Sequence, residues 1–212
     1  MLGFSELQRD AITEVLNIAI GRAAAALNQM VDDEEVRLSV PCLDFLSRSE
    51  ATLRLRRETG GAPTVAVKQR FAGPEAGDIL LIFPESRSLE LVHLMLRNTT
   101  PLETMTEMER EALVEVGNVL LNACLGSIAN LFRRPIDSSL PVYVEAGGDA
   151  ILHLGEDAGR TARSEDTVMF VHVEFALAQR DLRGYLACVM DIASAQAFGQ
   201  HIEDYVRQAI GN

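Results

Sequence analysis

The segment DAITEVLNIAIGRAAAALNQM at residues 10–30 returns in altered form about a hundred residues later, as EALVEVGNVLLNACLGSIANL at residues 111–131. Both segments carry apolar residues at helical spacing, so each predicts one long helix, the first running from Ser5 to about Met30. In both segments an asparagine follows a glutamate by three positions in the middle of the helix. The chain is therefore predicted to consist of two related halves, each opened by a long helix.

Each long helix is followed by strand-like segments and then by a second helix. The strands expected in the first half are EVRLSVPCLDFL (35–46), ATLRLRR (51–57), TVAVKQRF (64–71) and DILLIF (78–83), with a helix at PESRSLELVHLMLRN (84–98). Those expected in the second half are SLPVYVEA (139–146), AILHLG (150–155), TVMFVHVEFAL (167–177) and LRGYLACVMD (182–191), with a helix at IASAQAFGQHIEDYVRQ (192–208). The simplest organisation is a single domain over 1–212, built of two repeats at about 5–98 and 106–210.

The helices of one repeat are too few to cover a sheet alone. We therefore expect the strands of both repeats to merge into one antiparallel sheet with the long helices packed on it, which is an α+β fold with a pseudo-twofold repeat. Thr106 and Glu109 resemble a capping box ahead of the second long helix.

Charge and cysteine content exclude several classes of function. A formal charge of -12, from 31 acidic and 19 basic side chains, repels phosphate backbones and anionic lipid, so nucleic acid is a poor candidate partner. The three cysteines are widely spaced, lack a C-x-x-C pattern and are expected to be reduced thiols. The N-terminus lacks a basic region followed by an apolar run, and we expect no stretch long enough to span a bilayer. These features favour a cytoplasmic protein without membrane insertion.

The candidate functional residues of the first helix are Asp10, Glu14 and Asn17. Their spacing of i, i+4 and i+7 places them within about 60° of arc on one helix face. Gly21 continues this face, followed by Ala24, Ala25 and Asn28, so a partner backbone is expected to approach closely there.

The second helix repeats this arrangement with Glu111, Glu115 and Asn118, and Asn122 stands where the first helix has Gly21. One such trio alone is best explained as a solvated helix surface. Asparagine, however, is a mediocre helix former whose side chain competes for backbone hydrogen bonds. Its recurrence in mid-helix beside a carboxylate, at identical spacing, favours a function.

The two quoted segments resemble the paired signature helices of the CheC/CheX/FliY phosphatases. The pattern of that family is Asp or Ser, three residues, Glu, two residues and Asn, as in Asp10, Glu14 and Asn17. A proline follows 23 positions beyond the Asn, the spacing found between Asn118 and Pro141.

Each of the two copies departs from the family pattern at one position. In the first copy Pro41 falls one position late, at 24, which suggests a loop adjustment. In the second copy Glu111 replaces the expected Asp or Ser. The duplicated order of elements resembles CheC more than the single-site CheX, and FliY has an additional switch domain for which this chain has no room.

The resemblance implies a phosphatase that hydrolyses the aspartyl phosphate of a CheY-like response regulator in chemotaxis or two-component signalling. It implies that Asn17 and Asn118 orient the attacking water and that Glu14 and Glu115 pair with a lysine of the regulator. The regulator supplies the Mg²⁺, and the phosphatase needs no cofactor or metal of its own.

The resemblance also implies that Asp10 and Glu111 are peripheral docking groups. Gly21 and Asn122 lie beside them on the expected partner-binding surface. An alternative of another class is a non-catalytic adaptor that binds a response regulator or a CheD-like receptor deamidase. A structural part of the flagellar switch, by analogy with FliY, is a third possibility. Neither the cognate regulator nor the oligomeric state follows from these residues.

Overall fold

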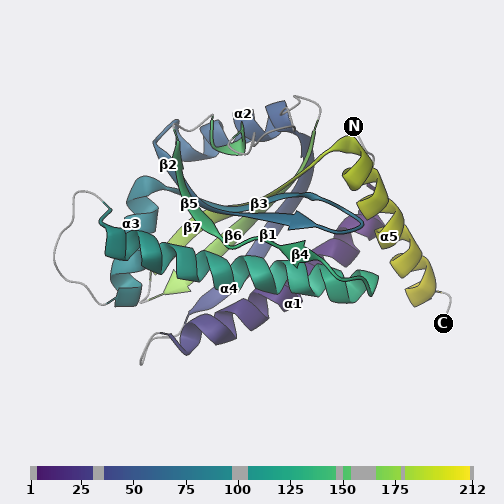
Figure 1. The fold of residues 1–212 in the computed structure, drawn as a ribbon, viewed down its shortest axis with the longest axis horizontal. Helices are drawn as coiled ribbons and strands as arrows, with labels where there is room; N and C mark the ends of the chain where they lie inside the picture. The colour runs from purple at the N-terminus through teal and green to yellow at the C-terminus, as the bar shows by residue number, and fades with distance from the viewer. Residues whose placement is uncertain are drawn as a thin grey trace.

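The computed structural model describes residues 4–30, 36–96, 105–146, 150–153, 166–177 and 180–210. The elements in chain order are α1 (Glu6–Asn28), β1 (Arg37–Ser47), α2 (Arg48–Thr59), β2 (Thr64–Ala72), β3 (Gly77–Pro84), α3 (Glu85–Leu96), α4 (Glu107–Phe132), β4 (Asp137–Ser138), β5 (Val142–Ala146), the 3₁₀-helix η1 (Ile151–His153), β6 (Thr167–Leu177), β7 (Arg180–Met190) and α5 (Ile192–Ile210). Two long helices lie across one face of a sheet and the short α2 lies at the other (Figure 1).

All described strands belong to one antiparallel sheet of order β1-β6-β7-β3-β2-β4, with β5 also paired to β2. Strands β2 and β3 form one hairpin and β6 and β7 another, and the two hairpins join where β3 pairs with β7. The strand after each long helix pairs with the hairpin of the other half, β1 with β6 and β5 with β2. Strands from both halves thus merge into one sheet, which confirms the predicted fold class. The repeat boundaries at about 5–98 and 106–210 stay a prediction.

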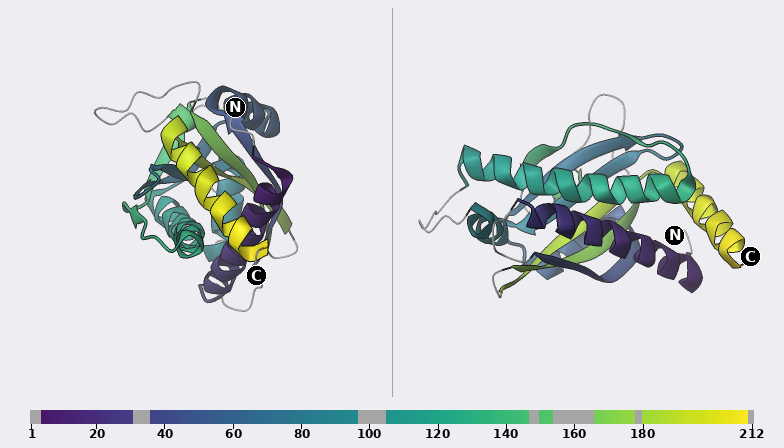
Figure 2. Two further views of the ribbon diagram at one scale, coloured as in Figure 1. Left: turned by 90° about the vertical axis from the view of Figure 1, so that its right-hand side faces the viewer. Right: turned by 90° about the horizontal axis from the view of Figure 1, so that it is seen from below.

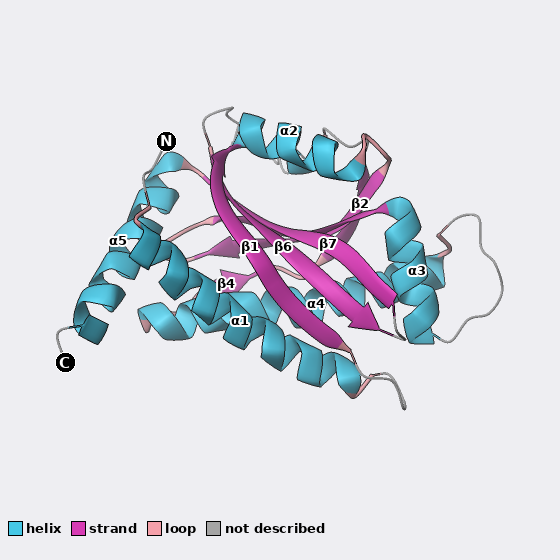
Figure 3. Ribbon diagram, turned by 180° about the vertical axis from the view of Figure 1, so that it is seen from behind, coloured by secondary structure: helices cyan, strands magenta, loops and turns pink. Residues whose placement is uncertain are grey.

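The sheet is buried on both faces, because its central strands alternate between two cores. Ile79 and Leu81 of β3 point toward the larger core, which α1, α3, α4 and α5 cover. Leu80 and Ile82 point toward a smaller core, which α2 and η1 cover. Figure 3 shows β1, β6 and β7 as neighbours, with α2 crossing one end of the sheet. The result is a three-layer arrangement in which the long helices form one outer layer.

Helices α1 and α4 pack side by side in opposite directions (Figure 2). An aromatic cluster fixes this direction: Phe198 of α5 contacts both Phe4, just before α1, and Phe132, at the end of α4, with ring centroids 6.4 and 5.3 Å apart. The start of α1 therefore lies near the end of α4. Both helices direct buried apolar residues inward, which leaves their opposite faces to solvent.

Capping boxes set where both long helices begin. In α1, Gln8 N–H donates to Ser5 Oγ (3.2 Å) and Ser5 N–H donates to Gln8 Oε1 (2.7 Å). In α4, the backbone N–H of Thr106 donates to Glu109 Oε2 (3.0 Å), as the sequence predicts. Each pair satisfies donors that the first helical turn cannot use itself.

The prediction of a strand at 51–57 is wrong, because this segment lies within the helix α2. Ser47 and Glu50 form a capping box at its start, and Gly60 ends it with a left-handed backbone at φ 63°. Ala51 and Leu55 are buried one helical turn apart while Leu53 is 60% exposed, which is helical and not strand-like burial. Arg54, Arg56 and Arg57 therefore lie on α2.

The prediction of a strand at 150–155 is also wrong for residues 150–153, which form a turn and the 3₁₀-helix η1. Residues 154 and 155 lie outside the described part of the chain. Short apolar runs of this kind are read from local pattern alone, which does not separate a strand from a buried turn. The buried guanidinium of Arg48 fixes η1 by donating to Leu152 O (3.0 Å) and pairing with Asp166 (2.7 Å).

The extra residue ahead of Pro41 is accommodated by a β-bulge and not by a loop. The register of β1 with β6 shifts by one between Ser39, opposite Glu174, and Cys42, opposite His172. Strand β1 is at the edge of the sheet, and proline, which lacks an N–H, is confined to edges and bulges of sheets. Pro41 lies inside this bulge, so the loop adjustment expected there is wrong.

Helix α4 is long and apolar enough, by length and composition alone, to cross a membrane. The expectation that no stretch reaches that length is therefore wrong for this segment. Half of its most apolar window is buried inside the fold, including Leu113, Leu120 and Leu121, as in the core helix of a globular domain.

Alanine substitutions at two glycines of α4 test the effect of core packing and the effect of helix propensity on stability separately. A Cβ on Gly117 would lie 2.5 Å from Val67 of β2, whereas a Cβ on Gly126 meets nothing within 4 Å. Gly117→Ala is expected to destabilise the fold by about 1–3 kcal/mol through overpacking. Gly126→Ala is the matched control and is expected to stabilise the fold by up to ~1 kcal/mol through helix propensity. Urea unfolding measures both, and equal effects of the two substitutions would contradict this close contact of α4 with β2.

Candidate functional site

The residues predicted as functional lie on the solvent-facing sides of α1 and α4. Those on α1 are Asp10, Glu14, Asn17 and Gly21, all exposed, and those on α4 are Glu111, Glu115 and Asn122, exposed, with Asn118 half-buried. Because α1 and α4 are neighbours on one face of the sheet, both polar faces belong to the same layer of the molecule (Figure 2). We call them the α1 face and the α4 face.

The α1 face is open. Among the described residues, the side chains of Glu14 and Asn17 have no hydrogen-bond or ion-pair partner. A Cβ on Gly21 would meet nothing within 4 Å, so the surface beyond Asn17 is low and accessible. An asparagine amide in this setting keeps both its acceptor and its donors for a ligand.

The flat stripe expected beyond Gly21 is shorter than predicted. Ala24 is 9% exposed and belongs to the core, while Ala25 faces solvent. Asn28 is engaged at the end of the helix, where its Nδ2 donates to Val36 O at 3.2 Å and its Oδ1 accepts from the Val36 N–H. Asn28 therefore holds the start of β1 and is not free for a partner.

The α4 face carries a hydrogen-bond chain that the α1 face lacks. Asn122 Nδ2 donates to Asn118 Oδ1 at 2.6 Å, and Asn122 Oδ1 accepts from Gln69 Nε2 at 3.1 Å. Gln69 is 2% exposed and also donates to Ser139 O at 2.8 Å. The orientation of Asn118 is thus tied, through Asn122, to a buried side chain of β2.

Sequence reasoning missed Gln69 because this contact joins residues 53 positions apart on β2 and α4. The only sequence signal was Asn122 itself, in place of the Gly21 of the first copy. The two faces thus match in their Glu and Asn but differ in how the asparagine is held. Asn17 is free to turn, whereas Asn118 is preorganised.

Apolar side chains stand beside both faces. Ile18, next to Asn17, is 48% exposed, and Leu140 is 85% exposed between Ser139, which Gln69 binds, and Pro141. An exposed apolar side chain next to polar groups is the composition of a protein contact. Each face therefore offers a carboxylate, an amide and an apolar neighbour.

Thiol chemistry has no support in this structure. Cys124 and Cys188 are buried and free, and burial raises the pKa of Cys124 to about 12 and raises the pKa of Cys188 as well. Since the thiolate is the nucleophile, neither side chain is reactive at neutral pH. Cys42 is half-buried and forms no disulfide.

Two curated relatives are similar to this chain in sequence, whereas no family model matches it. The flagellar motor switch phosphatase FliY of Bacillus subtilis is 28% identical over 177 residues, which are 82% of this chain and 43% of FliY. The CheY-P phosphatase CheC of the same organism is 29% identical over 144 residues, which are 66% of each chain. This chain thus spans less than two thirds of either relative.

Solved structures share the fold. FliY of Thermotoga maritima superposes with a TM-score of 0.75 over 97% of this chain and 100% of that chain, at 18% identity. The FliM middle domain from H. pylori reaches 0.65 over 93% and 99%, at 9% identity. A CheC-like superfamily protein from Shewanella sp. PV-4 reaches 0.51 over 84% and 97%, at 13% identity. At these identities the likeness concerns the fold alone.

The different settings of the two asparagines are measurable without a partner. The side-chain amide of Asn118 is expected to be more rigid than that of Asn17 on the picosecond-to-nanosecond timescale, because only Asn118 is held by a neighbour. Asn122→Ala is expected to make Asn118 as mobile as Asn17, and Asn130→Ala, on the same helix, to change neither. Amide ¹⁵N relaxation reports this, and a rigid Asn118 in the Asn122 variant would contradict the hydrogen-bond chain.

Proposed function

We propose, from its similarity to FliY and CheC, that this chain is a CheC/FliY-type phosphatase that dephosphorylates a phospho-aspartyl CheY-like response regulator. The carrying observation is the pair of Glu and Asn that occurs at the same spacing on the solvent-facing sides of both α1 and α4, where all but the half-buried Asn118 are exposed. The two sequence relatives named as phosphatases support the same activity. Such a regulator, and hence this protein, works in the cytoplasm.

The phosphatase itself needs to form no covalent bond in this reaction. An aspartyl phosphate is hydrolysed by in-line attack of water, and the regulator supplies both the phosphorylated Asp and the Mg²⁺ that neutralises developing charge. What remains is to place the water. The amide of Asn17 or Asn118 accepts a hydrogen bond from the water and donates to a phosphoryl oxygen, which orients the nucleophile without removing its proton.

Glu14 and Glu115 dock the regulator in this proposal. Each lies about one helical turn before its asparagine and is exposed, so its carboxylate can pair with a lysine beside the regulator's phosphorylation site. Asp10 and Glu111 extend the acidic edge one turn further. Gly21 leaves space for the regulator's backbone on the α1 face.

The hydrogen-bond chain makes Asn118 on the α4 face more ordered before binding than Asn17 on the α1 face. Asn118 Oδ1 already accepts from Asn122 and retains a second lone pair for the water. Holding one side chain in place before binding saves about 0.5–1.5 kcal/mol of ordering free energy. We therefore assign the faster chemical step to the α4 face.

A non-catalytic adaptor that binds a regulator or a CheD-like deamidase is the alternative. It would need the exposed surfaces of both faces but not their asparagines. A structural part of the flagellar switch is a further alternative, which rests on the name of the FliY relative, a flagellar motor switch phosphatase. Decay of a phosphorylated regulator with and without this protein separates enzyme from adaptor, because only the enzyme accelerates it.

Replacing both asparagines tests the activity. Asn17→Ala with Asn118→Ala is expected to lower stimulated phosphate release on the order of 100-fold, because the water is no longer oriented. Asn17 is exposed, and Asn118 is half-buried with a hydrogen bond to the exposed Asn122, so the thermal midpoint should change little. Asn130→Ala is the control. Undiminished phosphate release from the double variant would overturn the assigned mechanism.

The role of Asn122 is tested with the α1 face switched off. In an Asn17→Ala background, Asn122→Ala is expected to lower kcat roughly 2–10-fold, because it removes the preorganisation of Asn118, and a rise in KM would report the loss of a docking contact of Asn122. A rise in kcat would instead show that Asn122 competes with the water for Asn118 Oδ1.

A further inference from the structure

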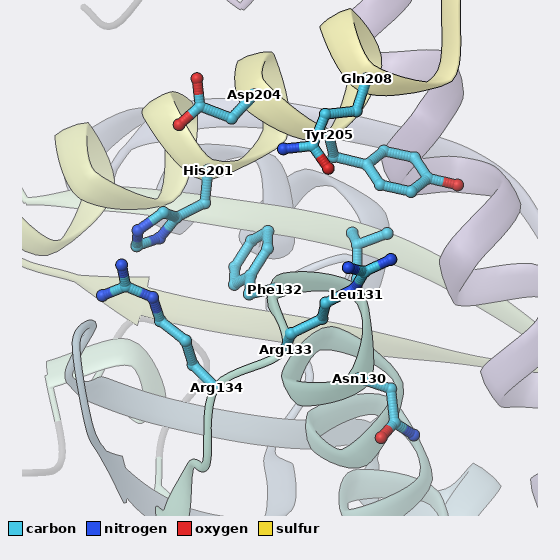
Figure 4. A pocket seen from close by; sticks show the side chains of 9 residues that line it. All are labelled: Asn130, Leu131, Phe132, Arg133, Arg134, His201, Asp204, Tyr205 and Gln208. Carbon is cyan, nitrogen blue, oxygen red and sulfur yellow. The ribbon is translucent and has the colours of Figure 1, made fainter. Parts of the chain in front are cut away.

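A hollow of about 500 Å³ lies between the C-terminal end of α4 and the helix α5 (Figure 4). This volume is within the range of pockets that take small molecules, ~300–1,000 Å³. No residue of the α1 or α4 face lines it, and Asn130 at its edge is about 18 Å along the helix from Asn118. The hollow is therefore separate from the proposed phosphatase surfaces.

Two adjacent arginines, Arg133 and Arg134, line this pocket and are exposed. Neither has an ion-pair partner among the described residues, although the chain carries 31 acidic side chains against 19 basic ones. Most other described arginines do have one, such as Arg54 with Glu58 at 2.8 Å. Figure 4 shows their guanidinium groups on different sides of the pocket, with Phe132 between them, so each offers its N–H donors to a separate part of the hollow.

The backbone at Arg133 is not one that an arginine favours. Its φ of 53° is left-handed, the conformation that ends a helix most readily with glycine. The turn closes as Arg133 N–H donates to Asn130 O (3.2 Å) and Arg134 N–H donates to Ala129 O (3.0 Å). The turn itself would form with glycine, so it does not account for the arginine.

The wall of the pocket toward α5 holds a fixed imidazole. His201 Nδ1 contacts Oε1 of Glu75, a carboxylate that is 2% exposed, and its ring packs on Phe132 with centroids 5.1 Å apart. An ionised carboxylate only accepts hydrogen bonds, so Nδ1 is the donor. Figure 4 shows the guanidinium of Arg134 pointing toward this imidazole.

The remaining lining is mixed. Tyr205 and Gln208 add hydrogen-bonding groups on α5. Asp204 is the single carboxylate among the lining residues, and Arg207 lies 4.0 Å from it. The dipole of α4 stabilises cations near its C-terminus, which accounts for the positive charge of the two arginines. It does not account for the hollow or for the fixed imidazole beside them.

We propose that this pocket binds a small oxyanion, a phosphate or carboxylate group of a metabolite-sized molecule, through Arg134 beside His201, with Arg133 adding positive charge from the other side of the hollow. The planar guanidinium presents paired N–H donors that match either group in a bidentate contact. The site lies apart from the phosphatase faces, and its ligand binds whether or not a regulator is present.

The proposal is tested with sodium phosphate and sodium citrate, each titrated at constant ionic strength against sodium chloride. The imidazole resonances of His201 are expected to shift and saturate at millimolar concentration. Saturation by phosphate alone assigns the site to phosphate carriers, and saturation by both assigns it to oxyanions in general. Either result supports the pocket as an anion site, whereas no saturable shift with either anion would overturn it.

Matched variants locate the binding. Arg133→Gly with Arg134→Gln should weaken binding at least tenfold while preserving the thermal midpoint, because glycine suits the left-handed turn. Arg22→Gln with Arg57→Gln removes the same charge from exposed positions on α1 and α2 and should leave binding unchanged. Equal affinity in the pocket variant and the control would show general attraction of anions and overturn the proposal. Arg134→Gln alone repeats the test with the native turn.

Discussion

The hydrogen-bonded pairing of β3 with β7 is the contact on which the remaining structure depends. It joins the two hairpins, and each hairpin then receives the strand that follows the long helix of the other half, β1 on β6 and β5 on β2. Neither half can complete its sheet alone. The exchange makes α1 and α4 neighbours, since each helix is tied to a strand that lies on the other half's hairpin.

This placement puts two copies of one surface on a single layer of the molecule. The inner sides of α1 and α4 are committed to the core, so only their outer sides can vary without cost to folding. The glutamates and asparagines occupy these outer sides. The sheet beneath the two helices fixes their position, which is the rigid support that the proposed placement of a water would need.

Pseudosymmetry leaves room for divergence between the copies. The first copy accommodates Pro41 by a bulge in an edge strand, whereas Pro141 stands just before β5. The first copy has Gly21 where the second has Asn122, and only the second ties its asparagine to the sheet through Gln69. Two sites of common design can thus differ in docking and in chemistry, which a single-site protein cannot combine.

The sequence by itself determined the two long helices, the merging of both halves into one sheet and the polar faces with Glu14, Asn17, Glu115 and Asn118, because helical spacing and capping are local properties. The assignment of roles to these residues remains a proposal. Residues 51–57 and 150–153 were mistaken for strands, since short apolar runs gain their structure from the core that they cover. The contact of Gln69 with Asn122 and the pocket between α4 and α5 join distant segments. Only the tertiary structure decided these, because packing, and not local pattern, brings such residues together.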